Sequence, residues 1–388
     1  MTRLPLRLVL LTNIPAPYRI DLFEWLADAP GVSAHVVFCP GGASAAVRRL
    51  AVSQDLRFPH SQLPGLRLPR TDRWIQVSPA RLLSRLFSLR PDVLVSGGFG
   101  LPTLVAVAYC RLTRAPLIIW TGGTARSEMR RSKPHRSVQR LLTKTAHSFL
   151  AYGPDSADFL AQLGVSRQRI FVAGNVTFDT CRYAKQIPSH AANSQHSSWS
   201  PEWPARYVLG VGQLVPRKNY RVLIEATGAA QRVAPHVGFG VVLVGSGPQE
   251  SELRTLAQAS GVGARVKFLG WRSQTELPPL YGAASLFAHP SLLDQWPQSV
   301  NEAMAAGLPV LASNRAGLPM DLIQPGVNGM LLDPLDSDSW MDAIVRLLSL
   351  AANELEAQGR ASQTAIRRWD LEYSGRMFLE TAFKAAGR

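Results

Sequence analysis

The feature of this sequence that most constrains its fold is a repeated alternation of short apolar runs with amphipathic helical patterns. In the first half, apolar runs at 6–11, 32–38 and 92–96 are separated by helical patterns such as those at 18–27 and 79–88. Buried strands that alternate with helices of this length are typical of a parallel sheet covered by helices on both faces. The sequence therefore predicts an α/β protein built from doubly wound sheets.

The alternation is interrupted at residues 186–204, where Ser, Pro, Asn and His are frequent and no periodicity is present. Such a segment is typical of a linker. A chain of 388 residues is also long enough for two domains that each bury a core. We therefore expect an N-terminal domain at 1–185, a linker at 186–204, a second domain at 205–365 and a C-terminal helix within 366–388.

The net charge of +15 lies entirely in the first half of the chain. Residues 1–185 contain 25 Lys and Arg against 10 Asp and Glu, whereas residues 186–388 contain 17 of each. A positive field of this kind attracts an anionic membrane, a lipid phosphate or a nucleic acid. The alternative is an arginine-rich surface that is only solvated. Because no stretch alternates aromatic with basic residues, we expect no nucleic-acid partner.

The cysteines, histidines and apolar runs argue against several classes of protein. Cys39, Cys110 and Cys181 are odd in number and far apart, and neither a CxxC nor an HExxH pattern is present. Neither a disulfide framework nor a zinc site is therefore indicated. The apolar runs fall short of the roughly 18 residues that a membrane-spanning helix needs. We expect a cytoplasmic protein without a metal site or a transmembrane helix.

Two glycine turns follow predicted strands in the second half. Gly212 precedes Lys218 at the start of a helical pattern, and Gly245 and Gly247 precede a helix that starts at Pro248. Glycine allows the backbone to approach a ligand closely, and the free N–H groups of a helix N-terminus bind anions. With the charge of Lys218, these turns predict a diphosphate site, although a strand-to-helix glycine is more often only a turn.

The stretch 289–313 adds two carboxylates to this prediction. It reads as a strand end, a polar loop with Asp294, a helix entered at Pro297 and carrying Glu302, and a second buried strand. Elements in this order form a βαβ unit, which binds ligands at the carboxyl ends of its strands. Carboxylates there accept hydrogen bonds from the hydroxyls of a ribose or a hexose. The alternative is a capping aspartate and a solvated helical glutamate.

Together these segments resemble the nucleotide-sugar-binding domain of the retaining glycosyltransferases of family 4, which have the GT-B architecture. The resemblance covers roughly residues 206–350. Its successive blocks are GQLVPRKNYRVLIEA, VLVGSGPQESEL, VKFLGW, LYGAASLFAHPS, DQWPQSVNEAMAAGLPVLAS and GVNGMLLDPLDSDSW. It implies two Rossmann-like domains that face each other across a cleft, with the C-terminal helix packed back on the first domain.

The resemblance also implies roles for individual residues. The family's paired acidic residues, eight apart, fall on Asp294, which would contact the donor sugar, and on Glu302, which would contact the ribose. Lys218 would hold the diphosphate, and these three are the expected catalytic residues. The residues expected to bind the nucleotide sugar around them are Gly212, Gln213, Arg217, Gly245, Gly247, Gly270, Trp271, Gln295, Trp296, Gln298 and Ser299.

Three positions depart from the family's pattern. Asp294 stands where Glu is usual, and Gln213 replaces an arginine. The segment 295–298, Gln-Trp-Pro-Gln, replaces a loop of the Gly-Phe-Gly type, and its proline cannot donate an N–H. These departures leave Lys218, with Arg217, as the cation for the departing diphosphate.

The first half resembles the family only in outline. TNIPAPYRID at 12–21 stands in place of a glycine-rich loop, and TGGTARSEMRRSKPHR at 121–136 lacks the histidine that many members carry there. Five basic residues in this segment predict either a grip on an anionic acceptor or a mobile loop: Arg126, Arg130, Arg131, Lys133 and Arg136. The residues expected on the acceptor side are Tyr18, Arg19, Gly122, Gly123, Arg126, Ser127 and Glu128.

We therefore expect a metal-independent retaining glycosyltransferase that needs no cofactor. It would move a hexosyl group from a nucleotide diphosphate sugar to an acceptor hydroxyl. The expected acceptor is a lipid-linked glycan intermediate of bacterial envelope, lipopolysaccharide or extracellular polysaccharide synthesis, and the expected place is the inner face of the cell membrane. Two alternatives remain open: another GT-B enzyme, such as a nucleotide-sugar epimerase or hydrolase, and a non-catalytic basic binding protein with a degenerate site.

Overall fold

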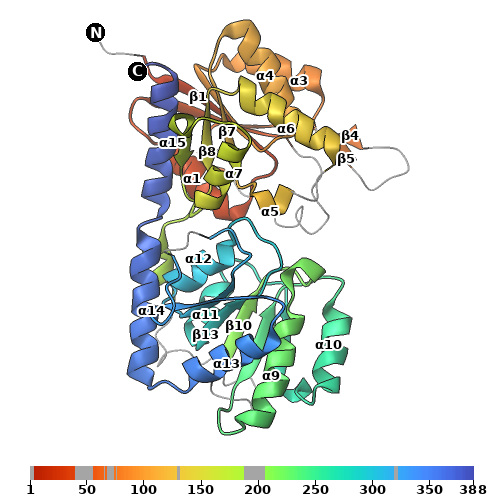
Figure 1. Ribbon diagram of the computed structural model, residues 1–388. Coiled ribbons are helices and arrows are strands. Elements are labelled where there is room, and N and C mark those ends of the chain that lie inside the picture. The colour runs from red at the N-terminus through yellow and green to blue at the C-terminus, as the bar shows by residue number, and fades with distance from the viewer. Residues whose placement is uncertain are drawn as a thin grey trace. The chain divides into compact units, whose positions relative to one another are not determined.

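The computed structural model describes residues 4–39, 56–64, 66–67, 74–75, 77–128, 132–187, 206–318 and 322–388. The chain forms two compact units (Figure 1), of which unit 1 contains Met1–Phe178 and Asp370–Arg388, and unit 2 contains Asp179–Trp369. Most of the expected linker 186–204 lies outside the described residues, as do Arg130 and Arg131 of the expected basic cluster.

The unit boundaries lie at other residues than those expected from the sequence. Helix α8 (Thr180–Lys185) belongs to unit 2, where it packs on α12 (Gln298–Ala305) and α14 (Ala352–Arg367). Near the end of the chain, unit 1 resumes at Asp370, whose side chain caps α15 (Leu371–Ala385). No change in composition marks either point, because a helix of one unit directly follows a segment of the other.

The main sheet of unit 1 is parallel, and its described strands lie in the order β3-β2-β1-β6-β7-β8-β9. These strands are β1 (Leu6–Thr12), β2 (Val32–Phe38), β3 (His60–Gln62), β6 (Val93–Gly97), β7 (Leu117–Thr121), β8 (Ser148–Ala151) and β9 (Ile170–Val172). A short antiparallel pair, β4 (Leu66–Arg67) and β5 (Trp74–Ile75), lies apart from this sheet. The helices of the unit are α1 (Pro17–Ala27), α3 (Pro79–Leu89), α4 (Leu101–Thr113), α5 (Ala125–Glu128), α6 (Lys133–Thr145), α7 (Pro154–Gln162) and α15.

The apolar run of β1 is continuous because both faces of this strand are buried. Leu8 and Leu10 point into one core cluster, whereas Val9 and Leu11 point into another on the opposite face. Side chains alternate between the two faces of a strand, so a central strand of a covered sheet needs apolar residues at nearly every position. This explains why the predicted strands read as unbroken apolar runs.

The last helix of the chain, α15, completes the core of unit 1. Phe378 and Ala382, one turn apart, are fully buried, and the Phe378 ring meets the Trp120 ring edge-on at 4.9 Å. Gly375 lies so close to Trp25 of α1 that an added Cβ would come within 2.3 Å of the indole. The end of the sequence is therefore a structural part of the first unit.

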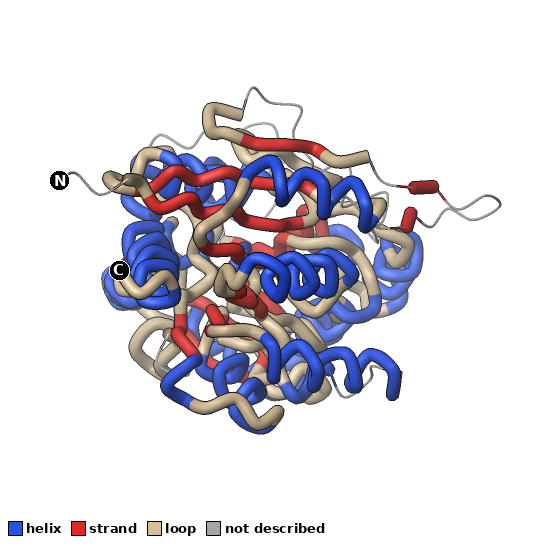
Figure 2. The backbone as a smooth tube through the Cα atoms, turned by 90° about the horizontal axis from the view of Figure 1, so that it is seen from above, coloured by secondary structure: helices blue, strands red, loops and turns tan. Residues whose placement is uncertain are grey.

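Unit 2 is a second parallel sheet, with the described strand order β12-β11-β10-β13-β14-β15. Its strands are β10 (Tyr207–Val211), β11 (Gly240–Val244), β12 (Val266–Gly270), β13 (Leu286–His289), β14 (Val310–Ser313) and β15 (Gly329–Leu332). Its other helices are η4 (Pro216–Lys218), α9 (Arg221–Val233), α10 (Glu250–Ala259), α11 (Leu277–Ala283) and α13 (Ser337–Leu348). Figure 2 shows strands of the sheets in red with helices in blue beside them.

Each sheet has a point at which the strand order reverses. In unit 1 the chain runs outward from β1 through β2 and then returns to β6 on the other side of β1. In unit 2 it runs outward from β10 and returns to β13 on the other side of β10. Open α/β sheets bind ligands beyond the carboxyl ends of the strands at such a switch point. The residues after β1 and β6, and those after β10 and β13, are therefore the first places to look for a site.

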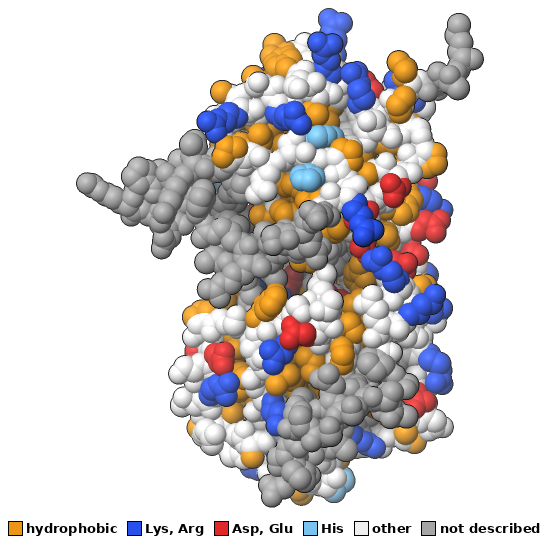
Figure 3. Space-filling model, turned by 180° about the vertical axis from the view of Figure 1, so that it is seen from behind, with side chains coloured by type: hydrophobic (Ala, Val, Ile, Leu, Met, Phe, Trp, Pro, Cys, Tyr) orange, Lys and Arg blue, Asp and Glu red, His pale blue; other side chains and the backbone are white. Residues whose placement is uncertain are grey.

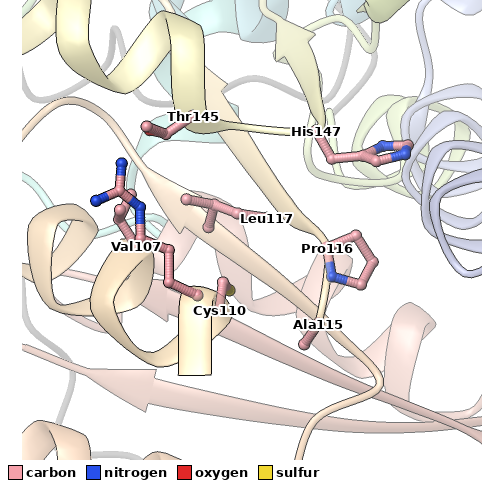
Figure 4. Close-up of a pocket in the computed structure, with 8 residues that line it drawn as sticks. Val107, Cys110, Ala115, Pro116, Leu117, Thr145 and His147 are labelled. Carbon is pink, nitrogen blue, oxygen red and sulfur yellow. The ribbon is translucent and has the colours of Figure 1, made fainter. Parts of the chain in front are cut away.

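A cavity of about 240 Å³ lies at the opposite edge of the unit 1 sheet (Figure 4). It is bounded by residues of α4, by the start of β7 and by His147 just before β8. Burial raises the pKa of the Cys110 thiol in its wall to about 12, so this thiol stays protonated at neutral pH.

In the part of the chain that the structure describes, no helix is long and apolar enough to cross a membrane.

Candidate functional site

The switch point of unit 2 brings together two segments that are far apart in sequence. The turn at 216–218 follows β10, and the loop at 290–294 follows β13. The Arg217 carbonyl oxygen accepts hydrogen bonds from the Ser291 hydroxyl at 2.9 Å and from the Leu292 N–H at 2.8 Å. These backbone contacts fix the turn against the loop and place their side chains in one site.

Lys218 and Asp294 form a close ion pair in this site. Lys218 Nζ lies 2.5 Å from Asp294 Oδ2, and both side chains are largely buried, with 11% and 15% of their surface exposed. The more exposed Arg217 guanidinium lies 3.8 Å from the same oxygen. His289 Nε2 lies 3.3 Å from it. Lys218 was expected to contact a phosphate only, whereas in the structure it pairs with Asp294.

The surroundings of Asp294 keep it ionised. Burial alone would raise the pKa of this carboxyl, but the Lys218 charge and the nearby His289 outweigh burial and hold the pKa well below its usual range. Burial lowers the pKa of His289, and the Lys218 charge lowers it further, so this imidazole is neutral at neutral pH. With Arg217 included, the cluster carries one net positive charge, which suits an anionic ligand.

Glu302 lies in a different environment from Asp294. Its Oε2 accepts a hydrogen bond from the Tyr281 hydroxyl at 2.7 Å, and the Tyr183 ring packs 6.3 Å from that of Tyr281. Burial raises the pKa of Glu302 to about 7, and the Tyr281 hydrogen bond opposes that rise only in part. The carboxyl therefore changes its charge near neutral pH, and a ligand that donates hydrogen bonds to it favours the ionised form.

The loop between Asp294 and α12 is held by its tryptophan. The Trp296 indole N–H donates to Asn301 Oδ1 at 2.8 Å, and its ring meets that of Trp369 at 5.5 Å. Its side chain is 3% exposed. Trp296 was expected to contact the nucleotide sugar, but the structure buries it in unit 2, because an indole of this size fills core space and its N–H has a partner there. It acts as the anchor of the loop.

The two glycine turns are packed on each other. A Cβ added to Gly245 would lie 1.9 Å from the Gly212 carbonyl oxygen, and one added to Gly247 would lie 2.2 Å from that of Leu214. The Gly212 N–H donates to the Val244 carbonyl at 2.9 Å, which holds the turns together. The need for glycine at 245 and 247 therefore arises from backbone packed on backbone, a requirement that is independent of any ligand.

The remaining predicted residues of unit 2 border this region to different degrees. Trp271 follows β12 and exposes 51% of its surface, and Gly270 has φ +69° with no atom near the position of an added Cβ. Such an exposed aromatic beside an open backbone offers a surface on which a planar ring can stack. Four further residues are partly exposed on the first glycine turn, on the loop and in the first turn of α12: Gln213, Gln295, Gln298 and Ser299.

Four residues of this region were missed by the sequence analysis: His289, Tyr220, Tyr281 and Tyr183. Tyr220 is fully buried, and its hydroxyl has no hydrogen-bond partner among the described residues. An added Cβ on Gly212 would lie 2.8 Å from that hydroxyl, so Tyr220 fills the space beneath the first glycine turn. A tyrosine two residues after Lys218 was visible in the sequence, but its direction depends on the αL conformation of Asn219, with φ +52°.

In unit 1 the predicted acceptor-side residues fall at the carboxyl ends of β1 and β7. Gly122 packs against the Tyr152 ring, which an added Cβ would approach to 2.4 Å. Glu128 is buried and accepts a hydrogen bond from Gln139 Nε2 at 2.8 Å. Arg126 is exposed, and Ser127 exchanges hydrogen bonds with Thr124 across the start of α5. The Arg19 guanidinium lies 5.6 Å from the centroid of the Tyr18 ring, and the Gly123 N–H donates to the Thr121 hydroxyl at 3.1 Å.

No group of three or more His, Cys, Asp or Glu side chains within the described ranges is placed to hold a metal ion. The described charged groups of the site are instead two cations and two carboxylates. The arrangement combines ammonium and guanidinium donors for an anion with carboxylate acceptors for hydroxyl groups. A ligand that carries both phosphates and sugar hydroxyls matches this set.

The second half of the chain is similar to a known family of proteins. The family model described as glycosyl transferases group 1 matches residues 195–367. A GDP-mannose-dependent alpha-(1-6)-phosphatidylinositol monomannoside mannosyltransferase of Mycobacterium tuberculosis is 35% identical over 172 residues, which cover 42% of this chain. The match spans only 44% of the length of that relative. A GDP-mannose-dependent alpha-mannosyltransferase of Corynebacterium glutamicum is 27% identical over 326 residues, or 82% of this chain and 72% of its own length.

Solved structures show the same fold over nearly the whole chain. The Anabaena protein HepE, solved in complex with UDP, matches with a TM-score of 0.77 at 22% identity and covers 97% of this chain and 99% of that one. WaaG, a glycosyltransferase involved in lipopolysaccharide biosynthesis, matches with a TM-score of 0.68 at 17% identity and covers 98% and 100%. The fold is therefore GT-B, with two Rossmann-like α/β units, and the fold class predicted from the sequence is confirmed.

Proposed function

Since the family model of the glycosyl transferases group 1 matches residues 195–367 and the chain has the GT-B fold, we propose that this protein is a retaining glycosyltransferase. It transfers a hexosyl group from a nucleotide diphosphate sugar to an acceptor hydroxyl. The observation that carries this proposal is the Lys218–Asp294 pair at the switch point of unit 2, with Glu302 on the helix that follows.

In the proposed complex, Lys218 binds the diphosphate of the donor and Asp294 binds its sugar. An ammonium has three N–H donors, and Lys218 uses one of them on Asp294, so up to two remain for phosphate oxygens. Arg217 adds an exposed guanidinium next to it. Asp294 stays ionised and accepts hydrogen bonds from sugar hydroxyls, while Glu302 accepts them from the ribose. Gly270 and Trp271 border the base.

In the proposed reaction the bond between the anomeric carbon and the diphosphate oxygen breaks, and its electron pair leaves with the diphosphate. The acceptor oxygen forms its bond to the anomeric carbon on the same face, and its proton passes to an oxygen of the departing diphosphate. Lys218 and Arg217 stabilise the charge that develops on the leaving group. We therefore expect the rate to be unchanged by EDTA, and the product to keep the anomeric configuration of the donor.

The acceptor is proposed to be a lipid-linked glycan at an anionic membrane surface. Support comes from the charge of residues 1–185 and from the exposed Arg126 of α5 and Lys133 and Arg136 of α6. Figure 3 shows Lys and Arg side chains scattered over one face of the molecule, with Asp and Glu side chains among them, so the support rests on the excess of positive charge in residues 1–185. Vesicles with anionic lipid should retain the protein at low salt and release it at high salt, because salt screens the attraction between opposite charges. Equal retention by neutral vesicles would contradict this.

The donor assignment is tested by a thermal-shift screen of UDP-glucose, GDP-mannose and an ADP-sugar. A ligand that binds only the folded state raises the free energy of unfolding by mass action, by about 2.7 kcal/mol at a ligand concentration of 100 times its Kd. The melting temperature rises as a result. We expect at least one donor to raise it, and Glu302→Ala to remove that shift. The matched control is Glu356→Ala, an exposed glutamate of α14, which should keep the shift.

The thermal-shift screen, together with product analysis of each donor incubated with and without an acceptor, separates the alternatives. Transfer of sugar to an added acceptor supports the proposal, whereas release of free sugar or of an epimer without an acceptor identifies a hydrolase or an epimerase. Absence of a shift with every donor identifies a binding protein with a degenerate site. A shift that survives in Glu302→Ala shows that the nucleotide binds elsewhere.

A further inference from the structure

The side chain of Arg19 lies at the switch point of the unit 1 sheet. It follows β1, and its guanidinium reaches the ends of three strands. Nη1 donates to the Thr12 hydroxyl at 3.0 Å, Nη2 donates to the Tyr152 hydroxyl at 2.8 Å, and the group lies 4.5 Å from the centroid of the Trp120 ring. Thr12 ends β1, Trp120 belongs to β7, and Tyr152 directly follows β8.

This arginine has no carboxylate partner within the described ranges of the chain. Other arginines of unit 1 pair closely, such as Arg7 with Asp92 and Arg167 with Asp158, each at 2.6 Å. The partners of Arg19 are two neutral hydroxyls and two aromatic rings. A buried charge costs free energy unless an opposite charge or strong hydrogen bonds compensate it. An arginine kept in such a place without an anion is therefore a candidate for binding one.

Hydrogen-bond donors also remain unused around this guanidinium. Arg19 Nε is buried and has no partner, and the buried Nε1 of Trp120 has none either. Both atoms are N–H donors, so each lacks an acceptor oxygen. Arg19 as a residue keeps part of its surface exposed, whereas its Nε atom is buried.

The surrounding residues hold the guanidinium in one orientation. Gly122 allows the Tyr152 ring to lie against the backbone after β7, and the hydroxyl of that ring then receives Nη2. Trp120 is fixed from its other side by Phe378 of α15. A cation that is already oriented loses little conformational entropy when an anion binds.

We propose that Arg19 binds a phosphate or carboxylate group of one of the reactants. The inference rests on the proposed function and adds to it that this reactant is an anion recognised by unit 1. A guanidinium presents several N–H donors in a planar fork that matches the oxygens of such a group. The anion belongs either to the nucleotide diphosphate or to the acceptor, for example a lipid phosphate.

Three probes measured by titration separate these sources: inorganic phosphate, UDP and GDP, and phosphatidylcholine vesicles with and without phosphatidylinositol. The variants are Arg19→Gln, which removes the charge, and Arg19→Lys, which keeps the charge but not the fork. The matched control is Arg167→Gln, since Arg167 is exposed and already paired. We expect Arg19→Gln to weaken phosphate binding about 10- to 100-fold and the control to leave it unchanged.

Each outcome decides the inference. Loss of nucleotide affinity in Arg19→Gln assigns the anion to the donor, and loss of vesicle binding with unchanged nucleotide affinity assigns it to the acceptor. Unchanged affinity for all three probes overturns the proposal. If Arg19→Gln does not fold, Arg19→Lys decides. If Arg19→Lys binds phosphate as tightly as the wild type does, the planar guanidinium is not what contacts the anion, and the proposal is overturned. Phosphate binding that depends on Arg19, in a protein that transfers no sugar in a separate assay with donor and acceptor, would refute the proposed function and leave Arg19 as an anion site of unit 1.

Discussion

Replacement of Lys218 by methionine removes one charge of the closest ion pair in the unit 2 site and keeps an unbranched side chain that is one heavy atom shorter. Breaking a buried pair in this way costs about 3–5 kcal/mol, because the other charge stays buried without compensation. Here both side chains keep some exposure, 11% and 15%, and Arg217 remains 3.8 Å from Asp294. We therefore expect a loss of about 2–4 kcal/mol in the free energy of unfolding.

The loss should depend on pH in a definite direction. In the wild type the pKa of Asp294 is depressed, so its contribution to stability is present above the unfolded pKa of about 3.9 and is lost as pH falls through the folded value. Without Lys218, only His289 and Arg217 oppose the effect of burial, so the pKa of Asp294 is higher than in the wild type. The buried carboxylate then costs stability as pH rises. The difference between wild type and Lys218→Met should therefore grow from pH 4 to pH 7.

The assay is thermal and urea unfolding at pH 4, 5.5 and 7. For a unit of this size each kcal/mol lowers the melting temperature by about 2–4 °C, so a fall of about 5–15 °C is expected at pH 7. Adding Asp294→Asn should restore at least half of the loss. The control Arg221→Met breaks the exposed pair with Glu225 and should change stability by less than about 0.5 kcal/mol. A loss in Lys218→Met no larger than in this control, with no recovery in the double variant, would refute the reasoning.

Two further changes test the packing and the titration of the same unit. Gly245→Ala should destabilise unit 2 by more than about 3 kcal/mol in urea unfolding, since its Cβ would lie 1.9 Å from a backbone oxygen. Gly270→Ala, where no atom lies within 4 Å of an added Cβ, should cost only the roughly 1–2 kcal/mol of a left-handed conformation, and equal losses would contradict this account. Because the pKa of Glu302 is raised to about 7, the wild type loses stability as pH rises from about 4.5 to 7. Glu302→Gln should therefore match the wild type at pH 4.5 and exceed it at pH 8 by at most about 3 kcal/mol, and a constant difference across this range would contradict the titration.

The fold class could be predicted from the sequence because the apolar runs correspond to strands of the structure and the amphipathic patterns between them correspond to helices. The run before Thr12 and the run at 286–289 became central strands, since both faces of each are covered. Lys218 and Asp294 could be assigned to one region because each follows a strand that borders the switch point. The rule that parallel strands end at the same edge brings together residues that lie far apart in sequence.

The contacts that tune the site could not be predicted in the same way. Tyr281 reaches Glu302 from another helix, and nothing in the spacing of the two residues indicates the hydrogen bond between them. Trp296 was expected at the ligand because it lies in the loop between Asp294 and α12. Its direction is set by Trp369, a contact that depends on the packing of the end of unit 2. Local patterns determine which strand end a residue follows, whereas side-chain direction depends on partners from distant segments.

The split of unit 1 between the two ends of the chain has a consequence for synthesis on the ribosome. Phe378 lies against Trp120 in the core of unit 1, yet it is made only after all of unit 2. Domains generally fold as units while the chain emerges, with the N-terminal one first. Here the unit that begins the chain lacks part of its core until the last residues are released. The second unit is continuous, so it is the first whose sequence is complete and free to fold.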